Sequence, residues 1–445
     1  MNHVVSGGSR VRFGLLIAVL FGGLASADAR AGALEDYVRQ PDPSFNWKRT
    51  QKKALKAGGT LSHLELVSQT WRDQFWSHHL MVFQPATVRQ SEWALLFVTG
   101  GSYNAPNEKE LDLLKAVADR AGVLVGILNK VPNQPLYDGR YEDALIAHTF
   151  DQYLKTGDQT WPLLFPMVKS AVRGMDTLQQ FAAKEWGYQV GHFVVSGASK
   201  RGWTTWLTGA VDPRVKAVAP MVIDMLNMKA QLGWAEKVYG RQSEEINDYT
   251  DINLHMKQDD PAMIRLREWV DPYAYRARYQ IPKLLLLGTN DPYWTVDSLR
   301  HYWNELLEPK AVFQTPNAGH DLAGGEQAVE TLAAFVEIVS QGGAFPSLDW
   351  TFQPGQSGAQ ARLKVSRPAR GIRVWTADSK DRDFRDDEWT ARELALADGG
   401  TSASTEIAQP AAGYRAYLLE ATLTSPGGHE FRLSTEARVT PDTQP

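Results

Sequence analysis

A serine, an aspartate and a histidine have the types and the order along the chain that acyl-transfer chemistry requires. Ser199 follows an apolar run that ends at Val195 and lies in the segment GASKRG, residues 197–202. A buried strand that turns through Gly-x-Ser directly into a helix is the setting of a nucleophile elbow. The usual second glycine, two residues after the serine, is replaced by Arg201, and Gly202 follows one position later. Taken alone, the segment could also be an ordinary turn before a helix.

Asp291 and His320 complete the candidate catalytic set. Asp291 follows the apolar run 283–287 within GTNDPYW, and His320 stands 29 residues later in PNAGH. The order serine, aspartate, histidine is that of α/β-hydrolases and differs from the orders in the chymotrypsin and subtilisin folds. Asp291 could instead cap a turn, and His320 could be a loop residue without a role. Three such residues, each after an expected strand, favour a catalytic triad.

Backbone N–H groups near the serine are candidates for stabilising an oxyanion. The N–H of Lys200 opens the helix after Ser199, where the helix dipole favours negative charge. Gly101 lies in TGGSYN, which follows the apolar run 93–98. Glycine lets the backbone approach a reacting carbonyl closely, although two glycines after a strand can also be a simple turn.

Four residues are candidates for binding the substrate: Arg201, Asp224, Tyr103 and Trp294. Arg201 could bind a carboxylate or oxyanion beside the nucleophile, or form an internal salt bridge. Asp224 ends the strand that follows the serine helix, so it either replaces Asp291 as the orienting acid or lines the pocket. We favour Asp291 for the orienting role.

Two further groups of residues invite a metal interpretation, which their spacing does not favour. His78 and His79 are adjacent, and the acidic segment 378–388 is interleaved with Lys380, Arg382 and Arg385. Neither has the paired ligand spacing of a metal site, and we expect the acidic segment to be a solvated loop. The proposed chemistry requires no metal and no organic cofactor.

Composition restricts the class of protein. The 445 residues are 43% hydrophobic and 22% charged, with a formal charge of -4 and no cysteine. This composition indicates an ordered globular chain and excludes disulfide scaffolds, thiolate metal sites and a cysteine nucleophile. It also gives no electrostatic reason to expect nucleic-acid binding.

The first 29 residues have the pattern of a secretory signal peptide. Arg10 and Arg12 precede the apolar run 13–24, and ASADA follows. Cleavage could fall after Ala27 or Ala29. The apolar run is short for a membrane span, so we expect a periplasmic or secreted protein with no stable membrane insertion after cleavage.

Alternation of strand and helix patterns predicts the fold. Two antiparallel strands, 60–69 and 74–83, precede buried apolar runs that alternate with amphipathic helices from residue 93 to residue 341. This pattern predicts a doubly wound α/β sheet over residues 34–341. Residues 225–280 interrupt it with helical pieces and are interpreted as a lid insertion or a helical decoration of the core. Strands are expected at 93–98, 123–128, 192–195, 215–220, 283–287 and 312–314, and helices at 108–120, 144–154, 161–185, 200–208, 296–307 and 327–341.

The last hundred residues change character. Short alternating runs separated by Gly, Pro and Ser replace the helical pattern beyond residue 343. Residues 344–440 are therefore expected to form a small antiparallel β-sandwich.

Several motifs together resemble the PhoPQ-activated pathogenicity-related protein family. They are SGASKRGWTTWL at 196–207, DPYAY at 271–275, Pro282-Lys283, GTND at 288–291 and PNAGH at 316–320. The resemblance covers nearly all of the mature chain and implies an exported α/β-hydrolase-like domain with a β-rich tail, but it supplies no defined substrate. Glucuronoyl esterases carry a loosely similar Gly-x-Ser-x-x-Gly elbow with an adjacent arginine, which motivates the carboxylate-binding role of Arg201.

Two hypotheses of function follow. In the first, the chain is an exported serine hydrolase that acts on a small-molecule or peptide substrate through an ester or amide bond. In the second, a hydrolase scaffold with weak or no activity serves as a secreted binding or signalling protein, which recognises a partner through the β-rich C-terminal region or through the aromatic 225–280 insertion.

Overall fold

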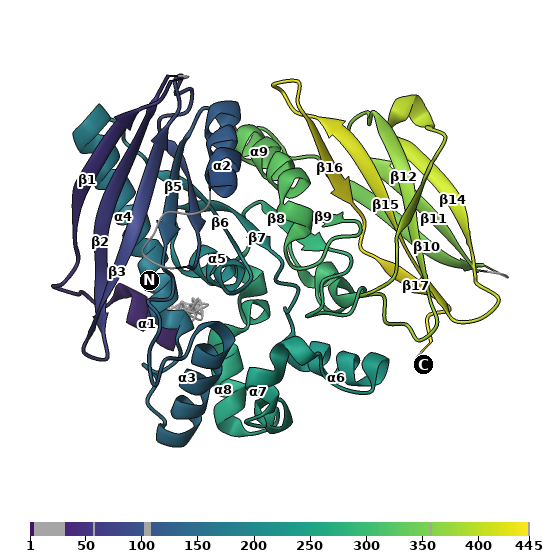
Figure 1. Cartoon of the computed structure of the whole chain (residues 1–445), viewed down its shortest axis with the longest axis horizontal. Helices are drawn as coiled ribbons and strands as arrows, with labels where there is room; N and C mark the ends of the chain where they lie inside the picture. Colours follow the sequence, from purple (N-terminus) through teal and green to yellow (C-terminus); the bar gives the residue numbers. More distant parts are fainter. Residues whose placement is uncertain (4–31, 57, 102–107, 356–357, 444–445) are drawn as a thin grey trace.

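Six parallel strands form the centre of the molecule (Figure 1). The computed structural model describes residues 1–3, 32–56, 58–101, 108–355 and 358–443. The parallel strands lie in the order β5-β4-β6-β7-β8-β9, and three antiparallel strands, β1-β2-β3, extend the sheet beyond β5. Their bounds are β1 Asn46–Ala54, β2 Thr60–Trp71, β3 Gln74–Gln84, β4 Trp93–Val98, β5 Leu124–Asn129, β6 His192–Ala198, β7 Val215–Met221, β8 Lys283–Gly288 and β9 Lys310–Thr315.

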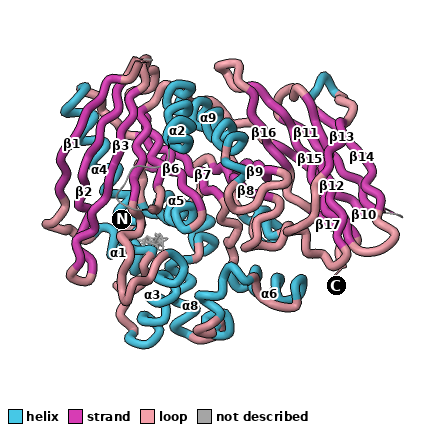
Figure 2. Tube along the Cα trace, viewed as in Figure 1, coloured by secondary structure: helices cyan, strands magenta, loops and turns pink. Residues whose placement is uncertain are grey.

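Helices cover both faces of this sheet (Figure 2). Apolar side chains of α4 and α5 pack against one face, and those of α2 and α9 pack against the other. Parallel strands buried on both faces explain the continuous apolar runs of the sequence. This topology is the α/β-hydrolase fold. The helices are α1 Ala33–Arg39, α2 Glu108–Ala121, α3 Glu142–Thr156, α4 Leu164–Trp186, α5 Lys200–Val211 and α9 Glu326–Ser340.

The 225–280 segment lies between β7 and β8 and is helical. Asp271 connects its two ends, because its carboxylate accepts the backbone N–H groups of Asn227, Met228 and Tyr273 at 3.2, 2.9 and 2.9 Å. The aspartate of the DPYAY motif therefore joins the start of the insertion to its last helical turn. The insertion contains α6 Met228–Tyr239, η1 Glu244–Ile246, α7 Asn247–Thr250, η2 Leu254–Lys257, α8 Pro261–Val270 and η3 Pro272–Arg278.

The C-terminal strands form two antiparallel layers. One layer has the order β10-β11-β14 and the other β16-β15-β12-β13, with β17 also paired to β15. Side chains that alternate between buried and exposed positions, as in β11, fill the space between the layers. The fold class expected from the sequence, an α/β-hydrolase sheet followed by a small β-sandwich, is confirmed. The strands are β10 Leu348–Gly355, β11 Gly358–Val365, β12 Gly371–Ser379, β13 Thr390–Glu393, β14 Ser402–Ala408, β15 Tyr414–Thr424, β16 Glu430–Ser434 and β17 Arg438–Thr440.

The two parts of the molecule share a sheet. Ser434 of β16 pairs with Val312 of β9, and Gln314 donates its backbone N–H to Ser434 Oγ at 3.0 Å. In the described residues, the central sheet and one layer of the sandwich thus form one 14-stranded sheet. The sequence pattern showed two separate regions, because a single pair of edge residues leaves no periodic signal.

One helix was predicted wrongly, and one strand of the large sheet was not anticipated. The helix expected at 296–307 is two short 3₁₀ helices, η4 Ser298–His301 and η5 Trp303–Glu305. Strand β1 was not anticipated, because nearly all of its side chains, NWKRTQKKA, are polar and exposed and show no alternation. Its place is decided by pairing with β2.

Within the described ranges, every helix is too short or too polar to cross a bilayer. The expected signal peptide lies almost entirely outside the described residues, since 4–31 are not among them.

Candidate active site

Ser199 occupies a strained position between β6 and α5. Its backbone angles are φ 57° and ψ −124°, which a non-glycine residue seldom adopts, and its N–H donates to Met221 O at 2.9 Å. A side chain on Gly197 would place Cβ 2.6 Å from Val98 O, and one on Gly202 would place it 2.8 Å from Met221 O. The elbow therefore needs glycine at both positions. Gly202 serves this purpose although it stands one residue later than in the usual motif.

A continuous chain of hydrogen bonds joins the three candidate catalytic side chains. Ser199 Oγ lies 2.8 Å from His320 Nε2, and His320 Nδ1 lies 2.9 Å from Asp291 Oδ2. Because a carboxylate only accepts, Nδ1 carries the proton in the neutral ring and Nε2 is left to accept from the serine hydroxyl. Asp291 Oδ1 accepts the backbone N–H of Tyr293 at 3.0 Å, which fixes the carboxylate. The arrangement is able to remove the serine proton.

The glycine-rich loop after β4 begins beside the nucleophile. Val98 pairs with Gly197 in register, and Gly101 then adopts a left-handed φ of 78° and is exposed. Lys130 N–H donates to Gly100 O at 3.0 Å and holds this backbone in place. Tyr103, the substrate-binding candidate of this loop, lies outside the described residues.

The guanidinium of Arg201 packs against the backbone of the glycine-rich loop. Its guanidinium forms two bonds of 2.6 Å with the carboxylate of Glu142, and its Nε donates to Val131 O at 2.5 Å. A Cβ on Gly100 would lie 2.0 Å from Arg201 Nη2, so the loop packs directly on the guanidinium. The pKa of Glu142 is lowered, because its bonds to Arg201 outweigh the effect of burial, which would raise it. Arg201 is thus occupied by protein partners and buried, and it does not line the pocket.

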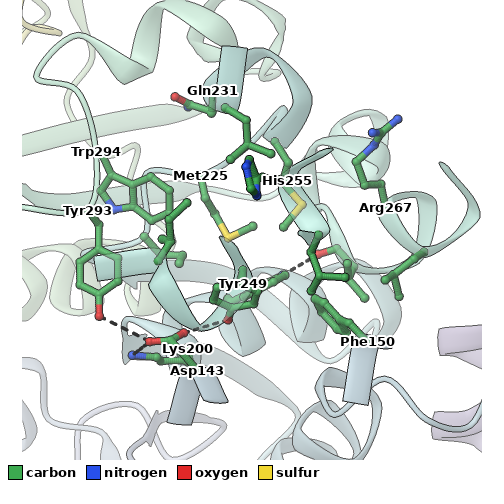
Figure 3. A pocket seen from close by; sticks show the side chains of 18 of the residues that line it. Asp143, Phe150, Lys200, Met225, Gln231, Tyr249, His255, Arg267, Tyr293 and Trp294 are labelled. Atoms are coloured by element: carbon green, nitrogen blue, oxygen red, sulfur yellow. Dashed lines mark hydrogen bonds and ion pairs between the residues drawn. The ribbon is translucent and has the colours of Figure 1, made fainter. Parts of the chain in front are cut away.

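Lys200 also has a protein partner (Figure 3). Its Nζ lies 2.6 Å from Asp143 Oδ2, while Asp143 Oδ1 accepts the hydroxyl of Tyr249 at 2.8 Å and Oδ2 that of Tyr293 at 3.4 Å. Tyr293 packs against the ring of His320 in a tilted arrangement, with centroids 4.4 Å apart. This cluster connects helix α7 of the insertion to the residues beside the nucleophile.

Asp224, the alternative orienting acid, faces another partner. It is buried, and its Oδ1 accepts the hydroxyl of Tyr302 at 2.5 Å. Burial, aided by the negative charge of Asp291, raises the pKa of Asp224 to about 7. The histidine is hydrogen-bonded to Asp291 instead.

The loops that carry Asp291 and His320 are held by the 380–389 loop of the C-terminal part. Asn290 Nδ2 lies 3.1, 3.1 and 2.8 Å from the carbonyl oxygens of Phe384, Arg385 and Asp387. Asn317 exchanges two bonds with the backbone of Trp389, at 2.9 and 2.7 Å. The residues next to the candidate acid and base are therefore fixed from the neighbouring part of the molecule.

The same loop corrects one expectation. Residues 378–388 were expected to form a solvated loop, but the side chains of Arg382 and Phe384 within it are almost completely buried. Arg382 Nη2 lies 3.0 Å from Asp297 Oδ2, and Trp234 of α6 donates to Asp297 Oδ1 at 2.9 Å. Burial would raise the pKa of Asp297, but Arg382 and Arg300 outweigh it and lower the pKa. The prediction therefore holds for the exposed Asp381, Asp386 and Glu388, and it fails for Arg382, whose charge is held in an internal ion pair.

A large cavity opens beside the serine. Its empty volume, including space open to solvent, is about 950 Å³, and both Ser199 and His320 lie in its wall, as do the candidate Trp294 and many apolar residues of the 225–280 insertion. Among the described residues, no group of three or more His, Cys, Asp or Glu side chains is placed to hold a metal ion.

Comparison with known proteins agrees with the motifs. The family model described as PhoPQ-activated pathogenicity-related protein matches residues 34–385. The chain belongs to this family. A relative, autocrine proliferation repressor protein A of Dictyostelium discoideum, is 31% identical over 474 residues, which cover 97% of this chain and 94% of the relative.

Solved structures resemble the family member only distantly. An acetyl xylan esterase from Paenibacillus sp. R4 is 15% identical, with a TM-score of 0.48, and covers 68% of this chain and 91% of its own. A glucuronoyl esterase from Solibacter usitatus is 13% identical, with a TM-score of 0.42, and covers 70% and 91%.

Several residues of the site were missed as separate candidates. Asn290 and Asn317 stand inside the GTND and PNAGH motifs, so their positions were visible, but their partners lie about 70–100 residues away. Glu142 and Asp143 carried no signal, because an acidic pair in the first turn of a helix is common.

Proposed function

We propose that the protein is an exported serine hydrolase that cleaves an ester or amide. The observation that carries the proposal is the continuous chain of hydrogen bonds from Ser199 through His320 to Asp291. The strained elbow and the adjacent cavity support it, since a nucleophile must be exposed to a bound substrate.

The proposed reaction proceeds through an acyl-enzyme. Ser199 Oγ attacks the carbonyl carbon while its proton passes to His320 Nε2, and Asp291 stabilises the imidazolium. The tetrahedral oxyanion accepts hydrogen bonds from the N–H groups of Lys200 and Gly101. His320 then gives the proton to the leaving oxygen or nitrogen. A water molecule, deprotonated by His320, releases the acid and restores the serine.

Removal of the nucleophile tests this function. Ser199→Ala should abolish labelling by a fluorophosphonate probe and lower kcat for p-nitrophenyl acetate by about 10⁴-fold or more. Ser404→Ala, at an exposed position of β14, is the matched control and should label like the wild type. Equal labelling of wild type and Ser199→Ala would contradict the assignment.

Of the substrate-binding candidates, Trp294 is the one we retain, because it lines the cavity. We assign Arg201 and Glu142 the role of supporting the glycine-rich loop, in view of their paired bonds. Asp224 is proposed as a buried structural acid.

A second candidate function rests on the relative. That protein is named as a repressor of proliferation, and similarity extends over 97% of this chain. A secreted signalling role on a hydrolase scaffold is therefore the alternative. A wild-type protein that is inert toward the probe and toward esters of every class would favour it.

Export is proposed from the sequence of residues 1–29 and is consistent with the family's name. Intact mass measurement of the protein recovered from the periplasm or medium would locate the cleavage after Ala27 or Ala29.

A further inference from the structure

The cavity beside Ser199 has a predominantly apolar wall. It reaches from the serine into the space between the α/β core and the 225–280 insertion, and its empty volume is about 950 Å³. Figure 3 shows Phe150 and Met225 around this space, together with polar side chains that bond to one another. Apolar contributors from core and insertion include Phe150, Trp203, Met225, Met263, Leu266 and Val270.

Several polar side chains of the wall bond to protein partners. Lys200, Asp143 and Tyr249 form one bonded cluster. Gln231 Nε2 lies 3.1 and 3.2 Å from two backbone carbonyl oxygens of the loop after β7. Arg267 Nη1 donates to the backbone and side-chain oxygens of Gln258, both at 2.7 Å. These bonds within the protein use part of the donors and acceptors of the wall, so fewer of them are open to a ligand.

Two ring nitrogens differ from the rest. Trp294 Nε1 and His255 Nδ1 are buried and have no hydrogen-bond partner among the residues that the structure describes. They can serve an isolated polar atom of a substrate. A sugar carries a hydroxyl on most of its carbons, and each hydroxyl buried without a partner is unfavourable. The wall therefore matches hydrocarbon much better than carbohydrate.

We infer that the substrate is an ester with an extended apolar acyl group, which lies in this cavity beneath the insertion. The inference rests on the proposed function and names its substrate class. The acyl group, rather than the alcohol, is assigned to the cavity because it stays bonded to Ser199 through both chemical steps, whereas the alcohol leaves after the first. Three methionines in the wall, Met225, Met228 and Met263, can adapt to chains of different shape.

The first test varies acyl length at a constant leaving group. With p-nitrophenyl acetate, butyrate, hexanoate and octanoate, kcat/KM should rise about fourfold for each methylene buried, until the cavity is filled. A preference for acetate over every longer chain would overturn the inference.

The second test narrows the cavity. Met263 is buried in its wall, whereas Ile264, its neighbour on α8, is 38% exposed. Met263→Trp should lower the ratio of octanoate to acetate kcat/KM at least about tenfold, since the larger ring takes up space needed by the chain. Ile264→Trp, the matched control, should leave the ratio within about twofold of wild type. Circular dichroism and thermal unfolding of both variants check that each is folded.

The outcomes separate the inference from the function on which it rests. Wild-type protein that hydrolyses acetate, is labelled at Ser199 and prefers short chains would overturn the acyl assignment and leave the hydrolase standing. Wild-type protein that is not labelled and hydrolyses no ester of any length would overturn both. If Met263→Trp does not fold, Leu266→Trp replaces it, because Leu266 lines the same wall. An unchanged ratio in a folded cavity variant would also overturn the inference.

Discussion

The candidate site is bordered by two regions that contact it in opposite ways. The 225–280 insertion faces the cavity mainly with apolar side chains such as Met263 and Leu266. The 380–389 loop contacts the Asp291 and His320 loops through directed hydrogen bonds to Asn290 and Asn317. Apolar contact is not directional and tolerates different ligands, whereas hydrogen bonds fix position. We propose that the insertion governs which substrate enters, and that the loop governs how well the candidate acid and base are aligned.

The largest effect is expected on the loop side. Asn290→Ala removes the donor to three backbone carbonyls and frees the loop that carries Asp291. We expect kcat to fall about 100-fold with little change in KM, because catalysis is sensitive to misplacement of the order of 1 Å.

Steady-state kinetics on the best p-nitrophenyl ester would measure this effect. Asn133→Ala, which removes an exposed bond to Phe75 O, is the control and should keep wild-type kcat. A folded Asn290→Ala enzyme with kcat within twofold of wild type would contradict the proposal that the 380–389 loop aligns the candidate acid and base.

A smaller and different effect is expected on the insertion side. Asp271→Ala leaves the N–H groups of Asn227, Met228 and Tyr273 without their acceptor. The insertion should loosen, so that KM for the longest accepted ester rises about tenfold, with kcat nearly kept, and unfolding becomes easier by about 2 kcal/mol.

Asp260→Ala is the matched control, because Asp260 caps α8 of the same insertion at an exposed position. It should cost about 1 kcal/mol and leave KM unchanged. An equal rise of KM in both variants would mean that general destabilisation of the insertion, and not the contact of Asp271 with its two ends, controls substrate entry.

The smallest effect on turnover is expected at Asp224, whose carboxylate accepts the hydroxyl of Tyr302. Its pKa of about 7 is above the ordinary 3.8, so the folded state binds a proton that the unfolded state has released between these pH values. The contribution of Asp224 to the free energy of unfolding is therefore most favourable at low pH and is lost as pH rises through 7. From pH 5 to pH 8, wild type should lose about 2 kcal/mol of stability that Asp224→Asn retains.

Urea unfolding at the two pH values measures that difference, with Asp386→Asn, at an exposed position, as the control. Turnover of Asp224→Asn should match wild type. A large loss of kcat would instead indicate that Asp224, and not Asp291, orients the histidine.

Much of the fold could be predicted from local pattern. The buried run 93–98 and the alternation at 74–83 correspond to β4 and to most of β3. Strand β1 could not be predicted, because its polar side chains are exposed and only its pairing with β2 makes it a strand. The prediction of a helix at 296–307 was wrong. The segment has amphipathic spacing, but its backbone forms two short 3₁₀ helices on either side of Tyr302.

The sequence by itself determined which residue types could do chemistry and at which strand ends they stand. Ser199, Asp291 and His320 follow apolar runs, and strands buried on both faces must be apolar throughout, so this signal is local. Tertiary structure alone decided the partners: Arg201 pairs with Glu142 rather than facing the cavity, and Asn290 bonds to a loop about 95 residues away. Such bonds depend on one pair of side chains meeting across the fold, and a single contact of this kind leaves no periodic trace along the chain.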